Sequence, residues 1–323
     1  MAGGQERVLR RRIKSVQSTK KITRAMELIA ATRVVKAQQR AAAARPYSEQ
    51  VTAVIQDLAE AGAGGDHPLL RTAEQVRKIA YVVITSDRGL AGAYNTSVIR
   101  AAERAVQDRR ADGIDYALIL VGKKAEGYFR FRGYRIDAAF SDMSDTPTYE
   151  DARTVAKVVT ETFEQGDVDQ VELIYTRFLS VGTQRVVVRR FMPLQTGLDT
   201  AGDPRPAAEG ASADYEFEPG PGPILDALLP RYAEARLFAA MLDSAASEHA
   251  NRQRAMKSAT DNAEELITKL SRIMNRARQD SITTEIMEIV GGAEAMSQGG
   301  DQTKSATTDA QQVHTDVPGA RSA

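Results

Sequence analysis

The sequence predicts an α/β protein with long helices at both ends: an antiparallel coiled coil of the N- and C-terminal helices, with a central Rossmann-like α/β domain of about five strands. Residues 231–290 form a run of 60 without glycine or proline, and residues 5–45 form another of 41. At about 1.5 Å per residue the first run alone spans roughly 90 Å, which no small domain can bury. Between the runs, apolar β-branched segments alternate with helical ones, as in α/β proteins.

The N-terminal coiled-coil helix is expected over residues 1–60. Its apolar residues recur in steps of three and four and form a narrow seam, as in coiled coils; they are Leu9, Ile13, Val16, Ile22, Met26, Ile29, Val34, Ala37 and Ala41. Residues 5–45 also carry twelve Lys or Arg against two acidic residues. A solvated helix face is the most general interpretation of this charge. An acidic protein partner and a nucleic-acid backbone are the alternatives.

The α/β domain is expected at residues 76–195. Residues 78–86 are a nearly continuous apolar run, typical of a strand that is buried on both faces. Later segments predict four more strands and three helices; the strands are expected at 116–121, 134–140, 170–178 and 183–192, and the helices at 95–111, 124–132 and 148–165. The sheet should be mostly parallel, with the last two strands forming an antiparallel hairpin because so few residues separate them.

Residues 196–222 are rich in Gly, Pro and Ala and are expected to be a linker. A C-terminal coiled-coil helix should follow at 223–296, with Leu266, Leu270, Ile273 and Ala277 in its seam. It is longer than the first helix by about 15–20 residues, or roughly 25 Å. Its last apolar positions therefore require an enclosing partner, because an isolated helix gains little stability in water. Residues 297–323 are almost without apolar side chains and should form a disordered polar tail.

Composition argues against a self-contained enzyme. The chain has no cysteine, so disulfides and thiolate sites are excluded, and its three histidines lie far apart. His249 is expected to be interfacial or exposed rather than a ligand. The Gly89–Gly92 turn lacks the third glycine of the dinucleotide fingerprint, and we interpret it as a tight turn. No catalytic, cofactor-binding or metal-binding residues are expected. No stretch is apolar enough to span a membrane, and without the apolar core of a signal peptide the protein should be intracellular.

Several segments, in collinear order over residues 5–296, resemble the γ subunit of F-type ATP synthases. They are 21–26 (KITRAM), 36–38 (KAQ), 86–92 (SDRGLAG), 228–232 (LLPRY), 244–249 (SAASEH), 275–279 (NRARQ), and 282–285 (ITTE) with Glu288 and 292–295 (GAEA). The resemblance implies a non-catalytic central-stalk rotor. Such a rotor couples proton flow through the membrane sector to conformational change and to ATP synthesis or hydrolysis at the β subunits.

The resemblance also implies partners and contact residues. The partners are the α and β subunits of the catalytic ring, the ε subunit and the membrane c-ring, with one copy of this chain per complex and no nucleic acid or cofactor. The complex would lie at the cytoplasmic face of a bacterial plasma membrane. Ring contacts are implied for Met26, Arg278, Gln279, Ile282, Glu285, Ile286 and Ile289. A basic shaft face of Lys20, Lys21, Arg24, Arg33 and Lys36 would oppose an acidic loop of β.

Two features depart from the family pattern: the polar tail after Met296, and the lack of the cysteine pair found in redox-regulated chloroplast relatives. Two other classes of function remain open from the residues themselves. One is a coiled-coil scaffold or nucleic-acid-binding protein that uses the basic N-terminal helix, for which salt-dependent DNA binding is the discriminating observation. The other is a small dinucleotide-dependent enzyme with helical arms, which would require cofactor binding by the middle domain.

Overall fold

The computed structural model describes residues 2–60, 67–194 and 220–312. Two long helices, α1 (Ala2–Glu60) and α5 (Pro221–Gln312), confirm the expectation drawn from the runs without glycine and proline. The chain divides into two compact units. The α/β unit comprises Thr23–Ser258, and the helical unit comprises Met1–Ile22 with Ala259–Ala323. Both long helices therefore contribute to both units.

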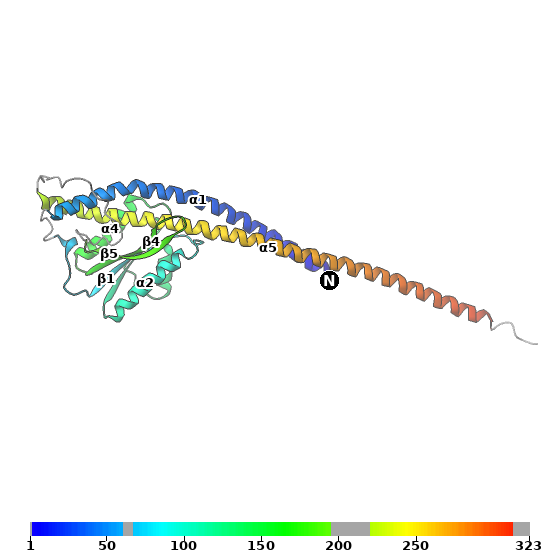
Figure 1. Ribbon diagram of the computed structural model, residues 1–323. Helices are drawn as coiled ribbons and strands as arrows, with labels where there is room; N and C mark the ends of the chain where they lie inside the picture. Colours follow the sequence, from blue (N-terminus) through cyan, green and yellow to red (C-terminus); the bar gives the residue numbers. More distant parts are fainter. Residues whose placement is uncertain (1, 61–66, 195–219, 313–323) are drawn as a thin grey trace, which may run out of the picture. The chain divides into compact units, whose positions relative to one another are not determined.

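A sheet forms the centre of the α/β unit (Figure 1). It has five strands in the order β3-β2-β1-β4-β5. The strands are β1 (Lys78–Ile84), β2 (Asp115–Val121), β3 (Ala138–Phe140), β4 (Gln170–Phe178) and β5 (Gln184–Met192). β1 pairs in parallel with β2 and β4, and β2 pairs in parallel with β3. β4 and β5 form an antiparallel hairpin. The predicted fold class is confirmed, although β3 is shorter than the expected strand.

Helices cover both faces of this sheet. α2 (Tyr94–Ala111) and α3 (Lys123–Phe131) pack on the face that presents Tyr81 and Leu118. α4 (Tyr149–Glu164) packs on the other face together with residues of α1 and α5, and a short 3-10 helix, η1 (Pro68–Leu70), adds Leu69 to the same core. Residues 79–84 of β1 are all buried, because a parallel strand between two helical layers needs apolar side chains on both faces.

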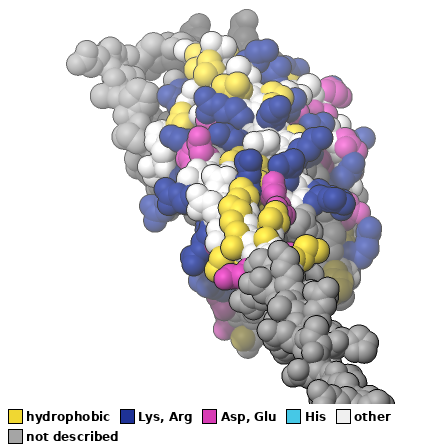
Figure 2. All heavy atoms as spheres, turned by 90° about the vertical axis from the view of Figure 1, so that its right-hand side faces the viewer, with side chains coloured by type: hydrophobic (Ala, Val, Ile, Leu, Met, Phe, Trp, Pro, Cys, Tyr) yellow, Lys and Arg dark blue, Asp and Glu magenta, His cyan; other side chains and the backbone are white. Residues whose placement is uncertain are grey.

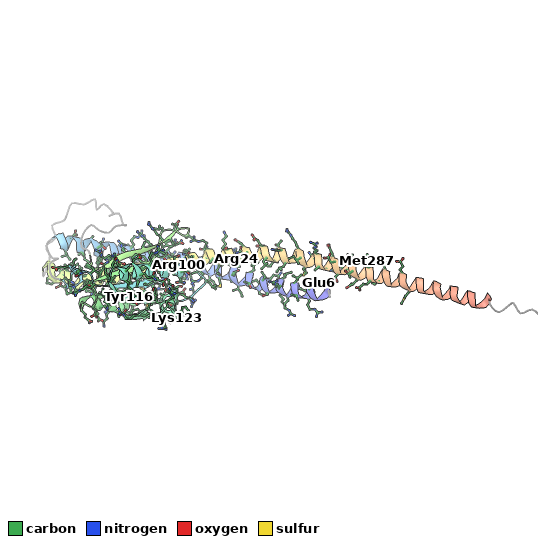
Figure 3. The ribbon with its side chains drawn as sticks, turned by 90° about the horizontal axis from the view of Figure 1, so that it is seen from below. Glu6, Arg24, Arg100, Tyr116, Lys123 and Met287 are labelled. Carbon is green, nitrogen blue, oxygen red and sulfur yellow. The ribbon has the colours of Figure 1, made fainter. Side chains whose placement is uncertain are left out.

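Within the α/β unit, α1 and α5 lie side by side and run antiparallel (Figures 1 and 3). The buried stripe of α1 follows alternating steps of four and three residues and consists of Thr23, Glu27, Ala30, Val34 and Ala37. This is heptad spacing, and Val34 and Ala37 belong to the predicted seam, whereas the three earlier positions are shifted by one residue from it. Ile22 and Ile29, both expected in the seam, are 61% and 53% exposed. The prediction was wrong there because two positions of the true stripe are polar.

The helical unit shows the same kind of phase error in α5. Ala263 and Leu270 are buried, whereas Leu266 and Ile273, which we expected beside Leu270 in the seam, are exposed. The true stripe again includes small residues, so it carries a weaker apolar signal than its neighbours. In this unit Lys20 of α1 forms an ion pair with Glu264 of α5, with 3.0 Å between Nζ and Oε1. A contact of this kind fixes the axial register of a helix pair more than it adds stability.

The expected linker and the expected tail lie partly outside the described residues. Of the expected linker, residues 196–219 lie outside the described residues, and α5 begins at Pro221. The expected disordered tail is helical in its first part, since α5 continues to Gln312, while residues 313–323 lie outside the described residues. The helix can continue past Met296 because adding residues to an existing helix is easier than starting one, and the next proline along the chain is Pro318.

Gly122 connects β2 to α3 in a position that tolerates no other residue. Its φ is +101°, in the region that favours glycine. A Cβ atom built there would lie 2.3 Å from the backbone oxygen of Thr85. The adjacent strands β1 and β2 can therefore approach this closely at their carboxyl ends only because residue 122 has no side chain. This end of the sheet lies next to the cluster described below.

Candidate functional site

The C-terminal part of α5 exposes a series of large apolar side chains. All described side chains from residue 282 onward are exposed, and they include Ile282, Ile286, Met287, Ile289, Val290 and Met296. Ile286 is 54% exposed and Ile289 is 72% exposed; Met287, labelled in Figure 3, is 70% exposed. Isolated exposed apolar residues are ordinary, but a contiguous group of this size indicates a surface that another protein covers. We call residues 282–290 the apolar end of α5.

The polar residues expected to contact a partner also lie on α5, whereas Met26 lies on α1. Arg278, Gln279 and Glu285 are exposed, so their side chains are accessible to a partner. Met26 is half-buried on α1. The structure therefore brings most of the expected contact residues onto one segment of α5.

The expected basic shaft face is less continuous than the sequence suggested. Lys20 pairs with Glu264, and Arg24 donates from Nη1 to Glu27 at 2.9 Å. Arg33 bonds to Asp145 of the α/β unit, so its charge is neutralised within the chain. The other two members, Lys21 and Lys36, are exposed. Other Lys and Arg side chains are scattered over the face shown in Figure 2, among strips of hydrophobic side chains.

An ionic cluster, which sequence reasoning missed, joins α1, the loop at residues 141–148 and α5; its members on α5 are buried, and those on α1 and the loop are half-buried. It consists of Arg33, Asp145, Glu248, His249 and Arg252. Arg33 donates to Asp145 Oδ2, and Arg252 donates from Nη2 to Glu248 Oε1 at 2.6 Å. Arg252 also donates to the backbone oxygen of Gly89 at 3.2 Å. Some of these residues are more than a hundred positions apart in the sequence, and no local motif predicts that they lie together.

His249 is held in one tautomer by its neighbours. Its Nδ1 lies 3.4 Å from Arg252 Nη1, which can only donate, so Nδ1 accepts. Its Nε2 then carries the proton and donates to the backbone oxygen of Asp145 at 3.0 Å. Burial lowers the pKa of His249, which favours the neutral form that this arrangement requires. The expectation of an interfacial histidine agrees with this placement, since His249 is buried between α5 and the loop.

Asp145, Glu248 and His249 are close enough to be considered as metal ligands, since one ligand atom from each lies within 4.8 Å of the others. The donor set does not suit a cation. Both nitrogens of His249 are engaged, and the carboxylates already face the guanidinium groups of Arg33 and Arg252. We therefore assign no metal to this cluster.

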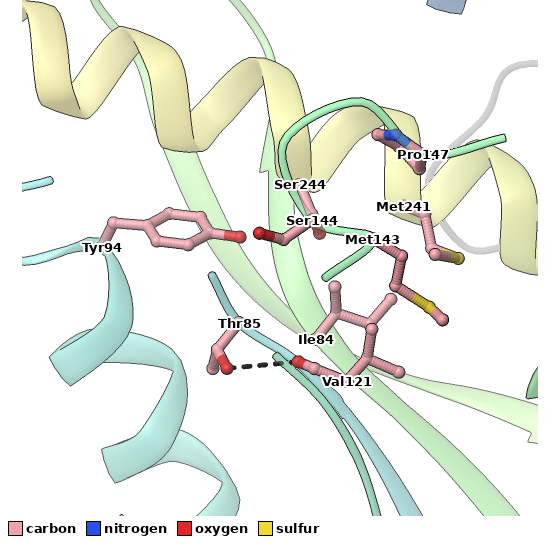
Figure 4. A pocket seen from close by; sticks show the side chains of 9 residues that line it. All are labelled: Ile84, Thr85, Tyr94, Val121, Met143, Ser144, Pro147, Met241 and Ser244. Carbon is pink, nitrogen blue, oxygen red and sulfur yellow. Dashed lines mark hydrogen bonds between the residues drawn. The ribbon is translucent and has the colours of Figure 1, made fainter. Parts of the chain in front are cut away.

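A small cavity of about 10 Å³ lies beside the cluster (Figure 4). Tyr94, Ser144 and Ser244 contribute polar groups to its lining, and the hydroxyl of Tyr94 points toward the two serines. Ser144 also binds the turn after β1, because the backbone N–H of Asp87 donates to its Oγ at 2.9 Å. A cavity of this size is far too small for a substrate or a nucleotide. The bond between Asp87 and Ser144 helps to hold the loop that carries Asp145.

None of the helices in the described ranges has a segment both long enough and apolar enough to cross a membrane. The family model described as ATP synthase matches residues 5–296. The ATP synthase gamma chain of Frankia casuarinae is 50% identical over 303 residues, covering 92% of this chain and 99% of that protein. That of Clavibacter michiganensis subsp. michiganensis is 46% identical over 301 residues, covering 91% and 98%. These matches extend over both long helices and the sheet.

Solved structures show the same fold at lower identity. A chain of the Euglena gracilis mitochondrial ATP synthase assembly of OSCP, F1 and c-ring is 19% identical, with a TM-score of 0.63 over 92% of this chain and 96% of that one. A chain of the Tetrahymena thermophila central stalk and c-ring is 22% identical, with a TM-score of 0.56 over 74% and 99%. The chain is thus a subunit of an ATP synthase. It belongs to the family of ATP synthase gamma chains, which confirms the resemblance found in its motifs.

Proposed function

We propose that this chain is the non-catalytic central-stalk rotor of a bacterial ATP synthase and couples proton flow to conformational change at the catalytic β subunits. The observation that carries the proposal is the exposed apolar end of a helix of 92 residues, in a chain whose relatives are gamma chains. Such a surface fits a ring of subunits that encloses it, because contacts between apolar side chains are non-directional. Strongly directional pairs would instead favour a single rotational position.

The partners follow from the same surfaces. The apolar end of α5 and the exposed Arg278, Gln279 and Glu285 are the proposed contacts with the α and β subunits, together with Met26. The ε subunit and the c-ring are the proposed partners of the α/β unit; both solved assemblies compared above include a c-ring. The proposed location is the cytoplasmic face of the plasma membrane, in keeping with bacterial relatives such as Frankia and Clavibacter.

The direct test is gentle purification of the tagged full-length chain from its own membranes, with subunit identification and an ATPase assay. Recovery of α and β in a ratio of three each to one copy of the chain, with ATPase activity, is the expected result. Recovery of the chain alone, or with nucleic acid, would contradict the proposal. Nucleic acid in the sample would favour the basic-helix alternative.

The exposed lysines of α1 are expected to contribute electrostatically to ring binding. Reversing two of them, Lys21→Glu with Lys36→Glu, should weaken assembly with α and β about three- to tenfold, because exposed charge contacts contribute little individually. The effect should be larger at about 50 mM salt than at about 200 mM. The matched control reverses two exposed arginines of α2, Arg100→Glu with Arg104→Glu. Equal weakening in both double variants would argue against a specific role for the α1 lysines.

Truncation after Met296 is expected to leave proton-driven ATP synthesis within about twofold of the wild type. The proposed ring contacts end before this residue, and the sequence beyond it is almost without apolar side chains. The measurement is ATP synthesis in membrane vesicles that contain the truncated chain, normalised to the amount of assembled complex. A large loss of synthesis at normal assembly would show that the tail has a function of its own.

A further inference from the structure

We propose that this ionic cluster is a proton-binding device that fastens α1 and α5 to the loop at residues 141–148. The cluster is complete when Glu248 carries a proton, and it is weakened when Glu248 ionises. This inference goes beyond the rotor function and does not depend on it, because the test below uses only the full-length chain.

The hydrogen bonds of the two carboxyl groups leave one oxygen of each without a partner. Asp145 Oδ2 accepts from Arg33, and Glu248 Oε1 accepts from Arg252. Their other oxygens, Asp145 Oδ1 and Glu248 Oε2, are buried and have no hydrogen-bond partner among the described residues. Glu248 itself is only 1% exposed. A proton on Glu248 converts one of two unsatisfied acceptors into a donor, and a pair of nearby carboxyl groups commonly shares a proton in this way.

The surrounding charges determine how firmly that proton is held. The charged and titratable groups around the cluster are Arg33 on α1, Asp87 after β1, Tyr94 on α2, Asp145 before α4, and His249 and Arg252 on α5. Burial raises the pKa of Glu248 to about 7, with the charges of Asp145 and Asp87 acting in the same direction and Arg252 opposing them. The burial penalty is the largest cause, since an ionised carboxylate loses its hydration here.

The cluster joins three elements that lie far apart in the sequence. Arg33 belongs to α1, Glu248 to α5, and Asp145 to the loop that the turn after β1 also holds. In that turn, Asp87 accepts hydrogen bonds from the backbone N–H groups of Ser144 and Lys123, each at 3.1 Å. Opening the cluster therefore releases Asp145 and one face of each long helix, while Asp87 still holds Ser144. Opening also returns Glu248 to water and to its ordinary pKa of 4.5.

The direction of the pH effect follows from this difference. Between pH 4.5 and about 7 the closed cluster binds one proton more than the open one, so its stability falls as the pH rises. Between pH 6 and pH 8 this amounts to about a tenfold fall in the closing equilibrium. His249 acts in the opposite direction below its ordinary pKa of 6.5, because burial lowers its pKa and the closed state then binds fewer protons. Comparing the wild type with a Glu248 variant separates the contribution of Glu248 from that of His249.

Hydrogen exchange followed by mass spectrometry on the full-length chain tests the proposal. Peptides that cover residues 141–148 and the Arg33 region of α1 are measured from pH 6 to pH 8, with rates corrected for intrinsic exchange. In the wild type, protection of both peptides should fall, and the ratio of wild-type protection to that of Glu248→Gln should fall about tenfold over this range. In Glu248→Gln, which resembles the protonated form, protection should not fall. The matched control, Glu164→Gln on an exposed position of α4, should behave like the wild type.

The proposal would be overturned if protection changed with pH in the same way in the wild type and in Glu248→Gln. A second measurement does not depend on how well that variant folds. Carbon-13 labelling of the glutamate carboxyl groups in the wild type should show a resonance that titrates near pH 7, and Asp145→Asn should lower its midpoint. If every glutamate titrates below about pH 5.5, as solvated glutamates do, the device does not exist.

Discussion

Ile286→Asp is expected to reduce proton-driven ATP synthesis at least tenfold while leaving the isolated chain as stable as the wild type. Ile286 is 54% exposed in the free chain, so a carboxylate there meets water and costs little. Inside the ring of subunits proposed to enclose the apolar end of α5, the same carboxylate would be buried against apolar side chains (an apolar collar) without a partner, at a cost of roughly 3–5 kcal/mol. Synthesis is measured in energised membrane vesicles, and stability by circular dichroism of the purified chain.

The control for this experiment is Ile286→Leu, which keeps the apolar character and nearly the same volume and should retain synthesis. Comparing assembled complex with activity then distinguishes two ways of failing. Loss of assembly would place the defect in ring binding, whereas normal assembly with low synthesis would place it in coupling. Unchanged synthesis by Ile286→Asp would show that this residue does not turn inside an apolar collar.

Gly122→Ala should destabilise the α/β unit by about 4 kcal/mol, within a range of roughly 2–6. Two costs add: a non-glycine residue at a φ of +101° is strained by roughly 1–3 kcal/mol, and overlap in a packed region costs about as much again. The overlap is with backbone, since the new Cβ would lie 2.3 Å from the oxygen and 2.7 Å from the carbonyl carbon of Thr85. Neither atom can move aside by a change of rotamer. Urea denaturation gives the change in the free energy of unfolding.

Gly113→Ala is the matched control for that variant. Its φ of +80° is also positive, but no atom lies within 4 Å of the position of the new Cβ. It should therefore show the conformational cost alone, about 1 kcal/mol. If both alanine variants lost the same stability, the close approach of β1 and β2 at Thr85 would not be the cause.

The strands were predictable because a sheet covered on both faces imposes a simple pattern on its residues. The apolar run at 78–84 has no polar interruption after Lys78, and β4 was predicted with its observed ends. The seam of the helix pair was harder, since Thr23 and Glu27 are buried in a stripe that also contains alanines. A periodicity read from large apolar residues then selects the adjacent positions. Burial of polar residues depends on the partner helix, which local sequence does not describe.

The residues of the candidate site also differed in how far the sequence could predict them. The apolar end of α5 was predictable because uncompensated isoleucines on a long helix need a partner whatever the tertiary structure. The role of Arg33 was not, because its partner Asp145 is 112 residues away. In the sequence, Arg33 cannot be distinguished from the other basic residues of its helix, because only the fold brings a carboxylate next to it. The same holds for Glu248, whose surroundings come from other elements of the α/β unit.

One stretch of α5 has a mechanical consequence. Residues 244–250 are buried at every position, which for an α-helix means contact on all sides over nearly two turns. Ser247 donates to the backbone oxygen of Thr176 in β4, and His249 donates to that of Asp145. A helix clamped in this way cannot turn about its own axis independently of the sheet. Torque applied to the α/β unit would therefore be transmitted to α5 at residues 244–250. Any elastic twist would arise in the part of α5 that follows these residues.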